Sequence, residues 1–137
     1  MKFQDDLNWI LIRASMVSKQ RLLKASEAND LTLMQGLTLC LLEPGEGVPM
    51  SAISDYLACD PSNVTGIVER LANGAYIERR ESAHDRRVKT VQLTKEGVAL
   101  RKKLLPNILA GDSPNAYKLT QEELDTLKRL LLKAMPK

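Results

Sequence analysis

The chain has few of the residues that build metal centres. Its 137 residues include two cysteines and one histidine. A structural zinc site made of Cys and His needs four ligands, so three cannot complete one. We therefore expect no metal. Cys40 and Cys59 are expected to be free thiols, which favours the reducing cytoplasm.

Long apolar runs are also missing. No uninterrupted stretch approaches the roughly 18 apolar residues that a membrane span needs. The segment Met1–Asp6 lacks the apolar run of a secretory signal. We expect one cytoplasmic domain over residues 1–137, with no membrane partner and with enough length to bury a core.

Catalytic signatures are equally scarce. The single histidine, His84, lies on a charged turn, where a solvated side chain is the expected state. The sequence contains no glycine-rich phosphate loop, no nucleophile elbow and no pair of acids in a plausible pocket. We therefore expect neither an enzyme nor a bound cofactor.

What the chain does contain is an unusual helix after Cys59. Pro61 suits a first helical turn, and the Asp60 carboxylate can accept hydrogen bonds from the free amides there. The residues expected on the buried face recur at helical spacing: Val64, Ile67, Val68 and Leu71. The opposite side and its flanks are small or polar: Ser62, Asn63, Thr65, Gly66, Glu69, Arg70 and Asn73.

This polar side fits a helix that presses into a groove. Ser62, Asn63, Thr65 and Arg70 are residue types that hydrogen-bond base edges and phosphates, although each alone could be plain surface. Glycine inside a helix costs about 1 kcal/mol relative to alanine. Gly66 is explained either by the close approach of a partner or by drift at a tolerant site.

The preceding residues complete a helix-turn-helix. Residues 5–25 have the periodicity of a helix with a broad apolar surface. Thr32 and Gln35 are spaced as a capping box for a helix through about Glu43, in which Cys40 is a core residue. After a turn at residues 44–47, residues 50–58 form a short helix, and two short helices joined by a few residues are a helix-turn-helix.

A basic hairpin follows. The pattern predicts strands over 76–81 and 88–93 around a turn at 82–87. Residues 79–89 hold five basic and two acidic side chains, a net charge of +3, which equals the net charge of the whole chain. A solvated turn is one explanation. A duplex backbone fits better, because clustered cations gain from counterion release on binding phosphates.

Two helices complete the pattern. Thr94 is expected to open a helix that continues through Ile108 and ends near residues 111–114. Thr120 and Glu123 form a capping box for the last helix, with Leu119 and Leu124 as a hydrophobic staple. Because the first and last helices are both strongly apolar, we expect them to pair in a homodimer. A bundle within one chain is the alternative.

Residues 31–97 resemble the winged helix-turn-helix of the multiple-antibiotic-resistance regulator (MarR) family. The resemblance is carried by Leu-Thr-Leu-Met-Gln (31–35), Ala-Ile-Ser-Asp-Tyr-Leu (52–57), Asp-Pro-Ser-Asn-Val-Thr (60–65), Val-Glu-Arg-Leu (68–71), Gly-Ala-Tyr-Ile-Glu-Arg (74–79) and, most specifically, Asp-Arg-Arg-Val-Lys-Thr-Val-Gln-Leu-Thr-Lys-Glu-Gly (85–97). It implies a mainly α fold with a small β-hairpin wing, in which 31–97 form the DNA-binding lobe and 1–28 with 98–137 form the dimerisation region.

By this resemblance, Ser62, Asn63, Thr65 and Gly66 would meet the major groove. Asp85 and Arg87 match the wing pair, in which the aspartate orients an arginine at the minor groove, and Arg86 would lie next to a phosphate. Pro49 stands where Ser or Thr often caps a helix, and Gly66 stands where arginine is frequent. Residues 50–75 therefore carry a net charge of −2, so we expect the wings, doubled in a dimer, to supply most of the electrostatic affinity.

The sequence thus predicts a sequence-specific double-stranded-DNA-binding regulator, with repression as the expected action. It would act as a homodimer on a pseudo-palindromic operator, and a small molecule or an oxidant of unknown identity would release it. Redox sensing through Cys59 is a weaker variant, because no cation is adjacent to Cys59 in the sequence. The alternative is a winged-helix protein-interaction module that does not bind DNA.

Overall fold

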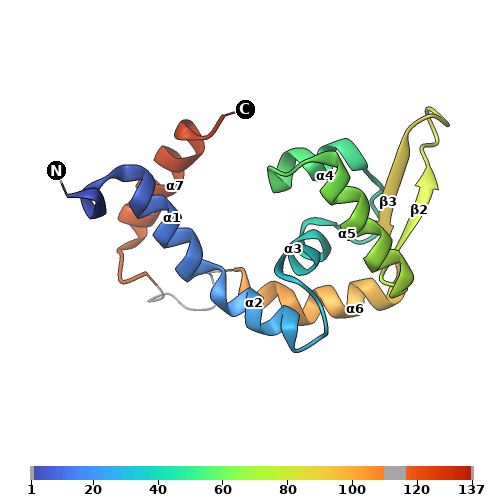
Figure 1. The fold of residues 1–137 in the computed structure, drawn as a ribbon, viewed down its shortest axis with the longest axis horizontal. Helices are drawn as coiled ribbons and strands as arrows, with labels where there is room; N and C mark the ends of the chain where they lie inside the picture. Colours follow the sequence, from blue (N-terminus) through green and yellow to red (C-terminus); the bar gives the residue numbers. More distant parts are fainter. Residues whose placement is uncertain (1, 110–116, 137) are drawn as a thin grey trace.

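The fold is mainly helical, with one small antiparallel sheet (Figure 1). A computed structural model describes residues 2–109 and 117–136. Its elements in chain order are η1 Phe3–Asp5, α1 Leu7–Ser18, α2 Gln20–Glu27, α3 Leu33–Leu41, β1 Val48–Pro49, α4 Met50–Leu57, α5 Pro61–Asn73, β2 Ile77–Glu81, β3 Lys89–Leu93, α6 Lys95–Leu104, η2 Leu105–Asn107 and α7 Gln121–Ala134.

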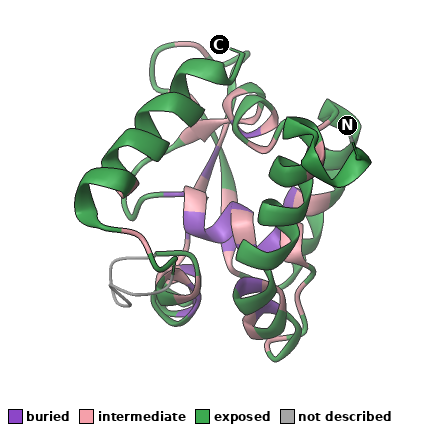
Figure 2. Ribbon diagram, turned by 90° about the vertical axis from the view of Figure 1, so that its left-hand side faces the viewer, coloured by how far each residue is buried: buried purple, intermediate pink, exposed green. Residues whose placement is uncertain are grey.

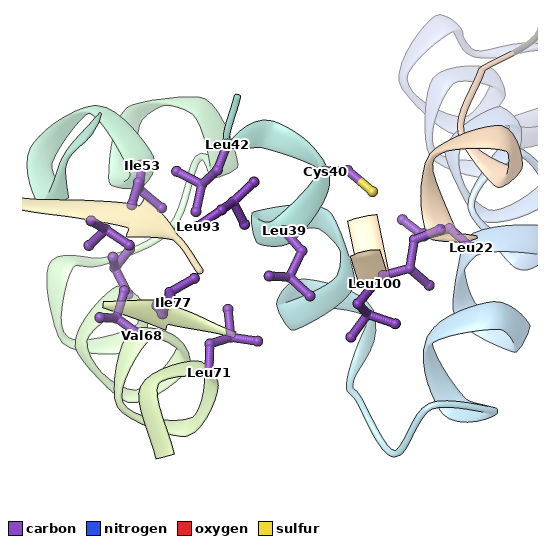
Figure 3. Packing of buried hydrophobic residues seen from close by; sticks show 13 residues of the cluster. Leu22, Leu39, Cys40, Leu42, Ile53, Val68, Leu71, Ile77, Leu93 and Leu100 are labelled. Atoms are coloured by element: carbon purple, nitrogen blue, oxygen red, sulfur yellow. The ribbon is translucent and has the colours of Figure 1, made fainter. Parts of the chain in front are cut away.

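The core lies where α3, α4, α5 and α6 meet the sheet. Its fully buried members include Leu39, Ile53, Val68, Leu71 and Leu104, several of which Figure 3 shows between these elements. The predicted hairpin is confirmed within one residue at the start of each strand, and Ile77 pairs with Leu93 in its register. The sequence did not reveal β1, which pairs with β3 through Val48 and Val91.

Local capping signals set several helix starts as predicted. Thr32 with Gln35 and Thr120 with Glu123 both form complete capping boxes. The Oγ1 of Thr94 accepts a hydrogen bond from the Gly97 amide at 3.0 Å and so caps α6. Each such bond satisfies an amide that the first turn would otherwise leave unpaired.

The single helix predicted over residues 5–25 is wrong in two respects. The Asp6 carboxylate accepts a hydrogen bond from the Asn8 amide at 2.9 Å, so α1 begins at Leu7. The helix is also interrupted at Lys19, between α1 and α2. Just before the interruption, the Ser15 and Ser18 hydroxyls donate to the carbonyls of Ile12 and Ser15. Such back-bonding bends helices.

Two other helix ends differ from expectation. The Asp60 side chain caps nothing, and the Asp60 carbonyl accepts the bonds from Asn63 and Val64 instead. The helix after Thr94 is regular only to Leu104 and then tightens into η2, because Pro106 lacks the amide that a further α-helical bond needs. Its expected end at residues 111–114 lies outside the described residues.

The base of the hairpin is joined to both neighbouring helices, and we call this connection the wing-base junction, made by Ala75, Tyr76, Thr94 and Gly97. The Thr94 amide donates to the Tyr76 carbonyl at 3.0 Å, and the Thr94 hydroxyl donates to the Ala75 carbonyl at 2.6 Å. A Cβ at Gly97 would overlap the Tyr76 carbonyl oxygen. The junction therefore needs glycine for space.

Helices α1 and α7 lie apart from the core. No residue of either helix is buried, and their exposed apolar side chains include Ile10, Met16, Leu127 and Leu130. Figure 2 shows both helices exposed along their length. In the part of the chain that is described, their apolar surfaces are thus left without a covering element. None of the described helices is long and apolar enough to cross a bilayer.

Gly97→Ala is expected to lower the free energy of unfolding by about 1–3 kcal/mol, because the new methyl group must displace backbone at the junction. Gly66→Ala is the matched control. Nothing lies within 4 Å of a Cβ at Gly66, so this change should raise stability by up to about 1 kcal/mol through helix propensity. Urea unfolding at one protein concentration measures both, and equal stability of the two variants would contradict the close-packed junction.

Candidate nucleic-acid interface

The turn between α4 and α5 is fixed by its own backbone and by one serine. Ala58 adopts the left-handed conformation, with φ 49° and ψ 44°, and ends α4. The Cys59 amide donates to the Ser54 carbonyl at 3.2 Å, and the Ser54 hydroxyl donates to the Cys59 carbonyl at 2.6 Å. These bonds set the direction in which α5 leaves the turn.

Helix α5 presents its polar side to solvent. Val64, Val68 and Leu71 are buried as predicted, whereas Ile67 is only half-buried. All seven residues predicted on this side and its flanks are exposed: Ser62, Asn63, Thr65, Gly66, Glu69, Arg70 and Asn73. The Thr65 hydroxyl donates to the Pro61 carbonyl at 3.0 Å. The surface around Gly66 is therefore open, with no atom within 4 Å of the position that a Cβ would take.

A shallow groove of about 400 Å³ runs along one side of α5. It is lined by Thr32, Met34, Gln35, Cys59, Ser62, Asn63, Gly66, Ile67 and Arg70. Four of the predicted site residues therefore share one concave surface with the start of α3, and Thr65 is not among them. Cys59 and Arg70 both line this groove, an arrangement that the sequence did not reveal.

The predicted wing pair forms at the tip of the hairpin. The Asp85 carboxylate accepts hydrogen bonds from the Arg87 Nε at 3.2 Å, from the Arg87 Nη2 at 3.3 Å and from the Arg87 amide at 3.0 Å. The side-chain bonds, followed by the amide bond, lower the pKa of Asp85 below its ordinary value. The Arg87 side chain is 91% exposed, so the carboxylate orients a guanidinium that still faces solvent.

Two more ion pairs lie along the strands of the wing. Arg80 contacts Glu78 at 2.5 Å, and Lys89 contacts Glu81 at 3.4 Å. Arg86 is exposed at the tip beside the Asp85–Arg87 pair. The three predicted wing residues, Asp85, Arg86 and Arg87, are therefore together at one end of the hairpin.

Within residues 2–109 and 117–136, no group of three or more Cys, His, Asp or Glu side chains could hold a metal ion.

These features define a winged helix-turn-helix. Helices α4 and α5 form the helix-turn-helix, and the β2–β3 hairpin follows as its wing. A family model described as "MarR family" matches residues 29–88. The solved structure of a mutant MarR from Escherichia coli complexed with operator DNA shares the fold, with a TM-score of 0.80 at 22% identity over 99% of this chain and 99% of that chain.

Two curated relatives extend the comparison. The transcriptional repressor MprA of Escherichia coli K12 is 34% identical over 89 residues, which are 65% of this chain and 50% of MprA. The uncharacterized HTH-type transcriptional regulator YfiV of Bacillus subtilis is 30% identical over 109 residues, which are 74% of this chain and 68% of YfiV. The chain belongs to the MarR family. It spans about half the length of MprA.

The two cysteines lie in different surroundings. Cys40 is buried in the core, as predicted, and burial raises the pKa of its thiol to about 11, although the positive charge of Arg101 opposes the shift. Cys59 is half-buried and lines the groove beside α5. Because the thiolate is the reactive form, the core thiol should be inert near neutral pH.

Labelling with a thiol reagent at about pH 8 is expected to modify Cys59 and to leave Cys40 intact, since a pKa of about 11 leaves the Cys40 thiol roughly one part in a thousand ionised. Mass spectrometry of the digested protein assigns the site. Cys59→Ser should abolish labelling of the folded protein, whereas Cys40→Ser should not. Rapid labelling of Cys40 without unfolding would show that the core placement is wrong.

Proposed function

We propose that the protein is a cytoplasmic transcriptional regulator that binds double-stranded DNA as a homodimer on a pseudo-palindromic operator and represses transcription. The observation that carries the proposal is the open polar side of α5, exposed around Gly66, next to a wing that displays oriented cations. Relatives named as transcriptional regulators support a binding role rather than a catalytic one.

In this proposal α5 lies in the major groove. Ser62 and Asn63, near the start of the helix, contact base edges, and the missing side chain at Gly66 allows a close approach. Arg87, held by Asp85, reaches the minor groove, whose negative potential favours arginine. Thr65, Arg70 and Arg86 contact the neighbouring backbone.

The dimer is proposed to form through residues 1–28 and 98–137, and residues 31–97 form the DNA-binding lobe. The exposed apolar surfaces of α1 and α7 support this division, because monomers rarely expose such large patches. A second hollow of about 440 Å³ lies on α7, lined by Leu119, Glu122, Glu123, Thr126, Leu127 and Leu130. Because the chain belongs to the MarR family, the proposal also includes release of the protein from DNA by a small-molecule or oxidant effector.

Selection of bound duplexes from a random pool tests the proposal. Recovered sites should contain two inverted half-sites whose centres lie about 34 Å, one helical turn, apart. Failure to retain any duplex at low salt would reject the proposal and favour the winged-helix protein-interaction module. Recovery of a site without twofold symmetry would reject the homodimer arrangement.

Asn63→Ala is expected to cost about 1–3 kcal/mol on a selected duplex, and much less on a duplex in which the base pair it reads has been changed. Arg87→Ala should instead weaken binding to both duplexes, because a groove or backbone contact by a cation acts on any sequence. Fluorescence anisotropy with both duplexes separates the two patterns. Uniform weakening by Asn63→Ala would contradict base reading by α5.

Leu127→Asp is expected to shift the protein from dimer to monomer, since each subunit loses about 1.5–3 kcal/mol of apolar burial and gains a buried charge. Leu132→Asp is the matched control. Leu132 is 70% exposed, against 43% for Leu127, and by helical spacing it lies off the face shared by Leu124, Leu127 and Leu131. This variant should therefore remain dimeric. Sedimentation velocity at micromolar concentration reports the state. A wild-type monomer would remove the basis of the dimer.

A further inference from the structure

The five basic side chains of residues 79–89 fall into two groups. Three of them already contact a carboxylate: Arg80 with Glu78, Arg87 with Asp85 and Lys89 with Glu81. Among the described residues, no carboxylate lies within 4.0 Å of the charged nitrogens of Arg79 or Arg86. Arg86 belongs to the tip described above, whereas Arg79 lies on strand β2, nearer the base of the wing.

The strand register places Arg79 on the side of the wing that faces α5. Arg79 is paired with Val91, which is fully buried, and it follows Ile77 by two residues. Paired residues on neighbouring strands, and residues two apart on one strand, share a face of the sheet. Ile77 is buried in the same core cluster as Val68 and Leu71 of α5 (Figure 3).

Arg79 is therefore the next residue after buried Ile77 on this face of β2, and it is exposed. Arg80, the next residue, is paired with Thr90 and faces the other side of the sheet, where it contacts Glu78. The two adjacent arginines thus differ both in the face they occupy and in whether their charge is already neutralised.

An arginine without a carboxylate partner gains more from a phosphate than a paired one. The paired arginine must share or give up its carboxylate, whereas the free guanidinium displaces a counterion and forms two parallel hydrogen bonds with the phosphate oxygens. We propose that Arg79 contacts a backbone phosphate of duplex DNA from the strip between α5 and the wing, an inference that rests on the proposed function. This contact supplies a cation beside α5, whereas residues 50–75, which include α5, carry a net charge of −2.

The test is the salt dependence of binding to a fluorescein-labelled random-sequence duplex of about three helical turns, followed by anisotropy between about 50 and 200 mM KCl. Arg79→Gln should lower the slope of log K against log salt by about 0.9 for each subunit that contacts the duplex. Arg79→Lys should restore most of that slope. Arg80→Gln, the neighbouring paired arginine, should change it by less than half as much.

The inference would be overturned if Arg79→Gln and Arg80→Gln changed the slope equally, or if Arg79→Gln left it unchanged. In either case, binding by the wild-type protein would leave the proposed function standing. Absence of wild-type binding at the lowest salt would overturn both. Unfolding midpoints and sedimentation of each variant confirm that fold and dimer are retained. If Arg79→Gln proves unstable, Arg79→Met is the neutral variant: a slope lowered by about 0.9 per contacting subunit supports the contact, and an unchanged slope contradicts it.

Discussion

The wing-base junction holds the wing at a fixed position relative to α5. Thr94 takes part in three hydrogen bonds there: it donates to the carbonyls of Ala75 and Tyr76 and accepts from the Gly97 amide. These bonds tie the segment after α5, the end of β3 and the first turn of α6 to one another. Because the same Tyr76 carbonyl occupies the space that a side chain at Gly97 would need, the parts cannot shift independently.

A fixed wing matters because α5 has little electrostatic attraction of its own. Residues 50–75 hold Asp55, Asp60 and Glu69 against Arg70, and the Asp60 carboxylate is not used in a cap. Most of the basic side chains in residues 31–97 are therefore on the hairpin, which holds five of them. There, carboxylates at positions 78, 81 and 85 each hold one basic side chain. These pairs limit the excess charge and orient the arginine at the tip.

Features set by short-range chemistry could be predicted from the sequence. Thr32, Thr94 and Thr120 fixed three helix starts, and alternating residues gave both strands of the wing within one residue. The exposure of the polar side of α5 followed from its helical period. The pairing of Asp85 with Arg87 was predicted from the family resemblance. The hydrogen bonds between their side chains agree with the predicted role of the aspartate, which is to orient the arginine.

Features that depend on distant segments could not be read from the sequence. Strand β1 is two residues long, and its identity rests on pairing with β3 more than forty residues later. The groove that joins Cys59 and Arg70 to the start of α3 requires the packed helices. The interruption at Lys19 carries no proline or glycine signal and follows two serine hydroxyls that bond to backbone carbonyls. Likewise, the Lys89–Glu81 ion pair joins two strands and depends on their register.

Hydroxyl-radical footprinting of the protein on a duplex that it binds tests the central claim most directly, because it maps the helix and the wing in one experiment. If the junction holds each wing beside its α5, the account predicts a twofold-symmetric pattern. Minor-groove protection by the wings should flank two major-groove sites about 34 Å apart, one helical turn. Protection of one half-site without a twofold-related second, or central protection without flanking minor-groove sites, would contradict it.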